Sequence, residues 1–331
     1  MSLRNFLVAR LIAALLLLFG VVTLTFILVH AAPGEPFSAE RAAGLSPEAA
    51  GRLRAIFGAD VPLHVRYLRW LSAVARLDFG VSYAHRRPVT SVLGAALGPT
   101  LLLMGSALAL AAAAGAAAAC AAVALRNRAL DRTLDVLAVT AYSTPSFWIG
   151  VLLVQALSIG LGWLPASGWR SVDSEGIGPG SFLDAARHLL LPCLTLAVPA
   201  AAGIAMHLKE SLAASLATPS ALAALGRGGS PLRVTILHLR NASASAVTLL
   251  GFALPGLVGG SLVVEVLFAW PGMGRVTYEA ILARDLPVIM AAVALAAAVT
   301  VVGSIAADLG CALADPRVRL GAGGGAQGGE A

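Results

Sequence analysis

Charge is scarce in this sequence. Asp, Glu, Lys and Arg make up 12% of its 331 residues, against ~25% in an ordinary soluble domain. Hydrophobic residues account for 58%, and the mean hydropathy is +0.85. So little charge excludes a typical soluble globular chain and predicts an integral membrane protein.

Lysine and cysteine are nearly missing as well. Lys209 is the only lysine, and it follows AMHL, so no G-x-x-x-x-G-K-[ST] loop exists that could hold the phosphates of ATP. Cys120, Cys193 and Cys311 lie in apolar stretches without a CxxC spacing, which argues against a disulfide framework and a zinc site. No H-E-x-x-H sequence is present, so we predict no catalytic residue and no metal. The arginines are scattered in ones to threes, which argues against nucleic acid as a partner.

Six apolar stretches are each long enough to cross ~30 Å of hydrocarbon, which takes ~20 helical residues. They are residues 9–30, 100–124, 134–161, 189–212, 244–268 and 287–313. A cleaved signal peptide is an alternative for the first stretch, although its apolar run is longer than the usual ~7–15-residue signal core. Four prolines predict broken helices in the third, fourth and fifth spans: Pro145, Pro192, Pro199 and Pro255.

The short loops of one side hold most of the positive charge. If six spans alternate, that side receives Arg4, Arg10, Arg126, Arg128, Arg132, Arg227, Arg233, Arg240, Arg317 and Arg319. Such a side is expected to be cytoplasmic, which places both termini in the cytoplasm. The outer side then receives the long segment 31–98, where residues 46–58 and 64–77 predict two short amphipathic helices. The glycine-rich end, residues 315–331, is expected to be disordered.

Residues 218–241, between the fourth and fifth spans, carry helix punctuation on the cytoplasmic side. Thr218 and Pro219 predict a capping hydroxyl followed by proline in the first turn, and Gly226 suits the left-handed residue that closes a short helix. Ser230 and Pro231 repeat the start signal for a second helix. An ordinary capped loop is the alternative interpretation, because caps mark helix ends whatever those helices do.

The second of these helices has two stripes. Leu232, Ile236 and Leu239 share one, and Arg233 shares a neighbouring one with Arg240. The loop is therefore expected to be a helical hairpin with one apolar and one basic side.

This arrangement resembles the cytoplasmic loop of ABC-importer permeases, in which a short helix, a glycine and a following helix dock on the ATPase subunit. Further strings resemble, in order, the inner-membrane permeases of dipeptide, oligopeptide and nickel importers. They are APGEP (32–36), RYLRWL (66–71), LDFGVSY (77–83) with RPV (87–89), PSFW (145–148), GWLPASG (162–168), RHLLLPCLTL (187–196), VEVLFAWPGMGR (264–275), AILARDLPV (280–288) and DPRVRL (315–320). The resemblance covers nearly all of residues 1–320.

The resemblance implies an all-α membrane protein with six transmembrane helices in the type I ABC-importer permease fold. Residues 1–30 would hold the first span, 31–98 an outer segment, 99–314 a five-helix core and 315–331 a tail. The chain would form half of a translocation pathway in a bacterial inner membrane. Its partners would be a second permease, two P-loop ATPases that bind ATP and Mg, an external solute-binding protein and the lipid bilayer. The residues expected to couple to the ATPase are Thr218, Pro219, Leu222, Leu225, Gly226, Ser230, Pro231 and Arg233.

The loop departs from the family at its first helix. Residues 220–225 read SALAAL, where the family usually has an aromatic or acidic residue and several basic ones. This leaves open a scaffold that assembles without transporting, and a secondary transporter or channel is the main alternative from another class.

Two acidic residues lie within predicted spans, where ionisable groups are costly unless they face water or a partner. We expect Glu265 to be an interfacial carboxylate in contact with water, with a pathway role as the alternative. Asp308 is expected to be a structural ion-pair partner near the cytoplasmic face. Lys209 is expected to pair with its neighbour Glu210 on the surface.

Overall fold

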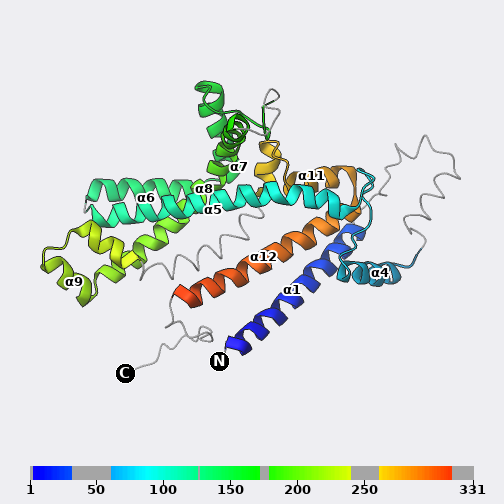
Figure 1. The fold of residues 1–331 in the computed structure, drawn as a ribbon, viewed down its shortest axis with the longest axis horizontal. Coiled ribbons are helices and arrows are strands. Elements are labelled where there is room, and N and C mark those ends of the chain that lie inside the picture. Colours follow the sequence, from blue (N-terminus) through cyan, green and yellow to red (C-terminus); the bar gives the residue numbers. More distant parts are fainter. Residues whose placement is uncertain (1–2, 32–60, 126, 172–178, 240–260, 315–331) are drawn as a thin grey trace. The chain divides into compact units, whose positions relative to one another are not determined.

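The first element of the chain is a single long helix, α1 (Leu3–Ala31), which confirms the first predicted span. The structure is a computed structural model, and it describes residues 3–31, 61–125, 127–171, 179–239 and 261–314. Figure 1 shows that the described part is built from helices; an isolated bridge between Val81 and Pro88 is the one β-type pairing in it. The predicted all-α class therefore holds for the described residues.

Three further predicted spans are long helices. They are α5 (Val89–Ala124), α8 (Pro179–Leu216) and α12 (Leu286–Ala314). α5 and α8 begin about ten residues earlier than predicted, because their first turns lack the hydropathy on which a span-length window depends. Together with α1, these helices are long and apolar enough to cross a membrane, and a bent helix pair could provide a fifth crossing.

The third predicted span is not one straight helix. It consists of α6 (Arg128–Ser143), α7 (Ser146–Leu153) and a π-helical turn, η1 (Val154–Gly160), with a bend of 108° between α6 and the α7–η1 part. Pro145 disfavours the helical conformation in the residue before it, and Thr144 is extended with φ −86° and ψ 129°. The predicted break at Pro145 is confirmed.

Other predicted breaks are wrong or lie outside the described residues. α8 continues as one helix through Pro192 and Pro199, and Pro255 lies in the undescribed part of the chain. The fifth predicted span, 244–268, is described only at its end, where residues 261–267 are helical. The expected helix at 46–58 and the tail at 315–331 also lie outside the described residues.

The chain forms two compact units. Unit 1 comprises Met1–Ala14, Leu101–Trp270 and Val299–Ala331, and unit 2 comprises Leu15–Thr100 and Pro271–Ala298. The core of unit 1 draws on α5, α8 and the segment after residue 260. Its buried members are Leu103, Met104, Ala107, Ala111, Leu191, Cys193, Leu196, Ala197, Ile204, Val264, Phe268 and Trp270.

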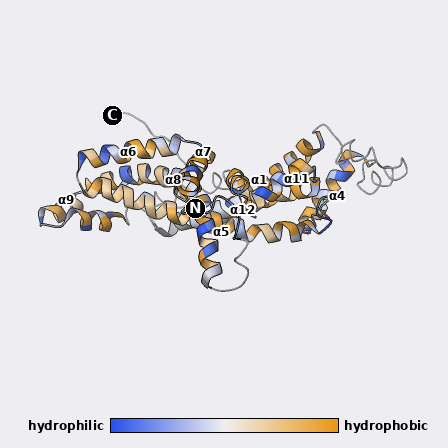
Figure 2. Cartoon of the chain, turned by 90° about the horizontal axis from the view of Figure 1, so that it is seen from above, coloured by the Kyte–Doolittle hydropathy of each residue, from blue (hydrophilic) through white to orange (hydrophobic). Residues whose placement is uncertain are grey.

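α7 packs closely into unit 1 at Gly150. A Cβ at this position would come within 2.8 Å of the Leu267 side chain and 3.1 Å of the Thr195 side chain, so a larger residue would require these side chains to shift. α6 instead lies along α8, as Figure 1 shows. Figure 2 shows both hydrophilic and hydrophobic residues on α6, which suits a helix near a membrane surface better than one surrounded by lipid.

In unit 2, α4 (Leu63–Ala75) confirms the amphipathic helix predicted at residues 64–77 and lies against the end of α1. The Tyr67 hydroxyl is 2.7 Å from Thr23 Oγ1, and the Tyr67 ring meets Phe26 edge-on at a centroid distance of 5.2 Å. Arg66 donates to His30 Nε2 at 3.1 Å. These contacts hold α4 to α1, although Leu68 of α4 is 60% exposed.

Candidate functional site

The predicted cytoplasmic loop is a helical hairpin. α8 ends at Leu216, α9 (Pro219–Gly226) follows, and after a turn the chain is helical again over residues 231–239. We call residues 218–239 the coupling hairpin, after the role that the family resemblance implies for this loop. Figure 1 shows α9 at the end of α8.

Thr218 begins α9 without capping it. Its backbone is extended, with ψ 149°, and Pro219 takes the first helical position as predicted. The Thr218 hydroxyl, however, donates to Ser215 O at 2.7 Å and lies 3.1 Å from Ser220 Oγ. The predicted capping hydroxyl is therefore wrong, because this side chain turns back to the last carbonyls of α8.

Gly226 is the last helical residue of α9 and does not have a positive φ, so the prediction that it closes the helix in the left-handed conformation is wrong. Gly228 takes that role with φ 85°. A Cβ on the next residue, Gly229, would come within 2.7 Å of Ala224 O, so a side chain has no room there. The glycine requirement therefore lies two and three residues later than the sequence indicated.

The start of the second helix follows the prediction. Arg233 N donates to Ser230 Oγ at 3.3 Å, and Val234 N donates to Ser230 O at 3.1 Å. Pro231 occupies the first turn, where its missing N–H has no helical partner to lose. Ser230 is therefore a true N-cap.

The buried face of the hairpin differs from the apolar stripe that was predicted from the sequence. Ala221, Val234 and Thr235 are buried, and the His238 Nδ1 atom lies 2.8 Å from Ser215 Oγ on α8. Leu239 packs against a cluster of Ala119, Leu208 and Leu212, as a member of the predicted apolar stripe should. The rest of that stripe, Leu232 and Ile236, is about half exposed.

The opposite face of the hairpin leaves large apolar side chains uncovered. The exposed fractions are 57% for Leu222, 51% for Leu232, 54% for Ile236 and 72% for Leu237. Arg227 and Arg233 are exposed as well, whereas Leu225 is half-buried. A group of exposed leucines beside arginines is typical of a surface that a protein partner covers.

Lys209 joins α8 to α6 beside the hairpin. Its Nζ lies 2.5 Å from Asp131 Oδ1 and 2.7 Å from Asp135 Oδ1. The predicted pair with Glu210 is therefore wrong: residues 209 and 210 point in different directions on α8, and α6 brings two carboxylates to the lysine.

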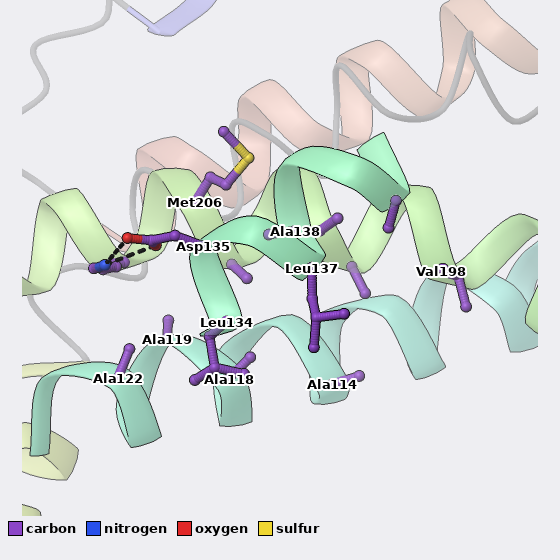
Figure 3. A pocket seen from close by; sticks show the side chains of 15 residues that line it. Ala114, Ala118, Ala119, Ala122, Leu134, Asp135, Leu137, Ala138, Val198 and Met206 are labelled. Carbon is purple, nitrogen blue, oxygen red and sulfur yellow. Dashed lines mark hydrogen bonds and ion pairs between the residues drawn. The ribbon is translucent and has the colours of Figure 1, made fainter. Parts of the chain in front are cut away.

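A pocket of about 240 Å³ opens between α5, α6 and α8 beside this ion pair. Figure 3 shows Leu134, Leu137 and Ala138 of α6 facing Ala114 and Ala118 of α5, with Asp135 at one end. Its lining is almost wholly apolar apart from Asp135 and Lys209.

The two acidic residues predicted within spans have different outcomes. Glu265 is fully buried in unit 1, so the expected interfacial carboxylate in contact with water is wrong. Its neighbours Val264 and Phe268 belong to the apolar core. Asp308 lies on α12, but its side chain is outside the described residues. Among the described residues, no group of three His, Cys, Asp or Glu side chains could hold a metal ion.

Residues 91–320 match the family described as the inner membrane component of binding-protein-dependent transport systems, and residues 3–104 match the N-terminal family of the same membrane components. The chain belongs to this family. The resemblance to ABC-importer permeases of the peptide branch is thereby confirmed, and the chain is a transport permease whose energy-supplying subunits are separate.

Several relatives align with this permease over nearly their whole length. It is 31% identical to the oligopeptide transport system permease of Bacillus subtilis over 95% of this chain and 98% of the relative. It is 36% identical to the glutathione transport system permease of Salmonella paratyphi A, covering 95% and 99%. A putative peptide permease of Brucella suis is 33% identical, covering 94% and 98%.

Sequence reasoning missed several residues that build the hairpin of this permease. No individual role was predicted for Gly228 and Gly229, and none for His238 and Ser215. The sequence did carry a signal for the two glycines. Two consecutive glycines before Ser-Pro indicate a backbone conformation that residues with a side chain disfavour. The His238–Ser215 contact joins residues 23 apart and has no local signal.

Proposed function

We propose that this permease forms half of a translocation pathway for peptides across a bacterial inner membrane. The support for peptides as solutes is the similarity to oligopeptide and glutathione permeases over nearly the whole chain. A second permease supplies the other half of the pathway, two cytoplasmic ATPases bind ATP and Mg, and a solute-binding protein delivers the peptide.

The observation that carries the ATPase assignment is the coupling hairpin. One face is fixed to the permease through His238, which contacts Ser215, and through Leu239. The other face exposes Leu222, Leu232 and Leu237 beside Arg233. A rigid, anchored element with an uncovered apolar face is suited to transmit force from a partner. Residues 220–225, SALAAL, carry no charge. Docking of the ATPase therefore depends on apolar contacts from α9 and on arginines of the following turn and helix.

The orientation is part of the proposal. By the positive-inside rule, the arginines on the hairpin and on α6 support a cytoplasmic location for these segments and for both termini. The outer side then holds α4 and the residues before α5. Glu265, buried in the core of unit 1, is proposed as a structural carboxylate rather than a group that contacts the solute. Asp308 remains a proposed ion-pair partner.

The test uses two leucines of similar exposure that lie on opposite sides of the membrane in the proposed orientation. Leu237→Asp changes the coupling hairpin, and Leu282→Asp changes α11 (Met273–Ala283), where Leu282 is 68% exposed. We expect Leu237→Asp to reduce co-purification of the ATPases and peptide-stimulated ATP hydrolysis at least tenfold, because a carboxylate in an apolar contact loses its hydration. Leu282→Asp should keep ATPase binding.

Three other outcomes would change the proposal. Normal ATPase binding and uptake by Leu237→Asp would make the hairpin an ordinary capped loop. Uptake by this chain alone, driven by an ion gradient and independent of ATPases, would establish a secondary transporter instead. Stable assembly with a second permease and ATPases but without any peptide uptake would support the scaffold alternative.

A further inference from the structure

Residues 77–89 of unit 2 form a tight hairpin that we call the outer hairpin. Ser82 N donates to Arg87 O at 2.9 Å, Arg86 N donates to Ser82 O at 3.0 Å, and Val89 N donates to Gly80 O at 3.0 Å. Arg86 has φ 53°, a left-handed conformation that is unfavourable for a residue with a side chain. The backbone of this short segment is therefore held in one shape by its own hydrogen bonds.

A buried carboxylate attaches the outer hairpin to the start of α12. Asp285 is fully buried, and its Oδ2 accepts hydrogen bonds from Ser82 Oγ at 2.5 Å and from Ala84 N at 3.0 Å. Asp285 N in turn donates to Ala280 O at 2.8 Å, which fixes the carboxylate to the end of α11. Charged hydrogen bonds inside protein are among the stronger ones, so Asp285 makes the hairpin and the α11–α12 turn one rigid element.

The tip of this element is basic and exposed. Arg86 and Arg87 are exposed, and their guanidinium groups make no hydrogen bond or ion pair with any residue that the structure describes. Arg284, next to Asp285, is also exposed and has φ 53°. The nearby exposed carboxylate, Asp78, accepts a hydrogen bond from Gly80 N within the hairpin itself. Two adjacent arginines on a strained and rigid turn therefore lack an acidic counterpart in the described part of the chain.

We propose that the outer hairpin is a docking point for an acidic surface of the solute-binding protein. The inference rests on the proposed function and its orientation, which put residues 77–89 on the side where the binding protein arrives. The family is named for its dependence on such a protein. Guanidinium groups bind carboxylates through two parallel hydrogen bonds and stay charged at every physiological pH, so Arg86 and Arg87 fit aspartate and glutamate side chains.

The rigidity of the hairpin favours a protein partner over lipid headgroups. A fluid headgroup adapts to any arrangement of arginines and gains little from a fixed one. A folded partner carries its carboxylates at fixed positions, so a tip ordered beforehand loses less conformational entropy when the two surfaces meet. Asp285 is then a positioning residue: it does not touch the partner but holds the backbone that presents Arg86 and Arg87.

The experiment uses the complete importer in lipid nanodiscs and its own purified solute-binding protein, with association and dissociation rates measured at several salt concentrations. We expect Arg86→Glu combined with Arg87→Glu to slow association and weaken binding at least tenfold at low salt, with a smaller difference at high salt. Arg69→Glu, an exposed site on α4, is the matched charge control and should change binding less than threefold. Basal ATP hydrolysis should stay unchanged in all variants.

Asp285→Asn and Ser82→Ala test the positioning role. Each removes part of the same contact without changing the arginines, so we expect faster dissociation with nearly unchanged association. A general folding defect would instead lower the yield of assembled importer or its basal ATP hydrolysis.

Three results would overturn the inference. The first is that the double arginine variant binds the solute-binding protein as tightly as wild type does, while the binding protein still stimulates ATP hydrolysis by the importer. This result leaves the proposed function intact. The second is a variant effect that appears only in nanodiscs with phosphatidylglycerol and vanishes in phosphatidylcholine, which would identify lipid headgroups as the ligand. The third is a wild-type importer that neither binds nor responds to the binding protein, which would remove the proposed function as well.

Discussion

Lys209 on α8 and Asp135 on α6 form an ion pair in which Nζ lies 2.7 Å from Oδ1 and 2.8 Å from Oδ2. Asp131, one turn earlier on α6, is a second partner of the same ammonium group. About nine residues, or two and a half helical turns, separate Lys209 from Thr218 at the start of the coupling hairpin. The only lysine of the chain thus ties α6 to the helix that leads into this hairpin.

Lys209→Met is expected to destabilise the packing of α6 on α8 by about 1–2 kcal/mol. The ion pair is partly exposed, which limits its contribution. Its loss also leaves two like charges one turn apart, which repel each other. The measurement is the melting temperature of the purified permease, together with peptide uptake by the assembled importer.

Two further variants make this test specific. Asp131→Asn with Asp135→Asn in the Lys209→Met background should recover most of the lost stability, since the repulsion disappears. Glu210→Gln, at the neighbouring position, should behave like wild type. Equal melting temperatures for Lys209→Met and Glu210→Gln would contradict a structural role for the ion pair.

Gly229→Ala is expected to be the most damaging alanine substitution in the turn of the coupling hairpin. Its Cβ would overlap Ala224 O, so α9 and the following helix must move apart, at a cost of about 1–3 kcal/mol. Gly228→Ala should cost about 1 kcal/mol for its positive φ. Gly226→Ala should be neutral or slightly stabilising, since its Cβ meets no atom within 4 Å and the residue is helical.

Peptide-stimulated ATP hydrolysis and co-purification of the ATPases should follow the same order across the three glycine variants. Loss of stimulation in Gly226→Ala with normal behaviour of Gly229→Ala would show that close approach of the partner, rather than hairpin geometry, decides coupling.

Tyr83 in the outer hairpin is expected to ionise at higher pH than a free tyrosine. Burial is the main cause that raises the pKa of its phenol above the ordinary value of 10.0, and the Asp285 carboxylate raises it further. Because the pKa of Tyr83 is higher in the folded than in the unfolded state, the neutral phenol stabilises the folded state, and this contribution is fully present below pH ~10. It is lost as the pH rises through the folded pKa.

The near-ultraviolet absorbance of phenolate, compared between wild type and Tyr83→Phe, measures this titration. The same comparison in an Asp285→Asn background should show a lower Tyr83 pKa, because one negative neighbour is gone. A Tyr83 titration at or below the ordinary tyrosine value would show that the outer hairpin is open to water.

The topology can be tested with single cysteines at exposed arginines in a background that lacks Cys120, Cys193 and Cys311. In intact cells, Arg128→Cys on α6 and Arg233→Cys in the coupling hairpin should resist a membrane-impermeant thiol reagent, and Arg87→Cys in the outer hairpin should react. Reaction of Arg233→Cys from outside would reverse the orientation and both docking proposals with it.

The sequence alone determined the membrane class, the family and most of the long helices. Hydropathy over ~20 residues reflects transfer into lipid and does not depend on which helices become neighbours, so α1, α5, α8 and α12 were predictable. Ser230 and Pro231 were read correctly for a similar reason, since a cap involves atoms within one turn. The predictions for Thr218 and Gly226 were wrong although they also concern atoms within one turn. The Thr218 hydroxyl donates to the Ser215 carbonyl instead of capping α9, and Gly228 instead of Gly226 takes the positive φ. The residue types alone do not decide between these local alternatives.

Only the tertiary structure decided which distant groups meet. Asp285 binds Ser82 across 203 positions, and Lys209 binds Asp135 across 74, so no periodicity or spacing could pair them. The burial of Glu265 likewise depends on how residues 261–267 pack with α5 and α8. The preference of a residue for a helix, a cap or lipid depends on bonds and hydration within a few residues of the chain. The distant contacts instead form because whole helices pack together and exclude water from one another, and this packing depends on how the helices are arranged in space.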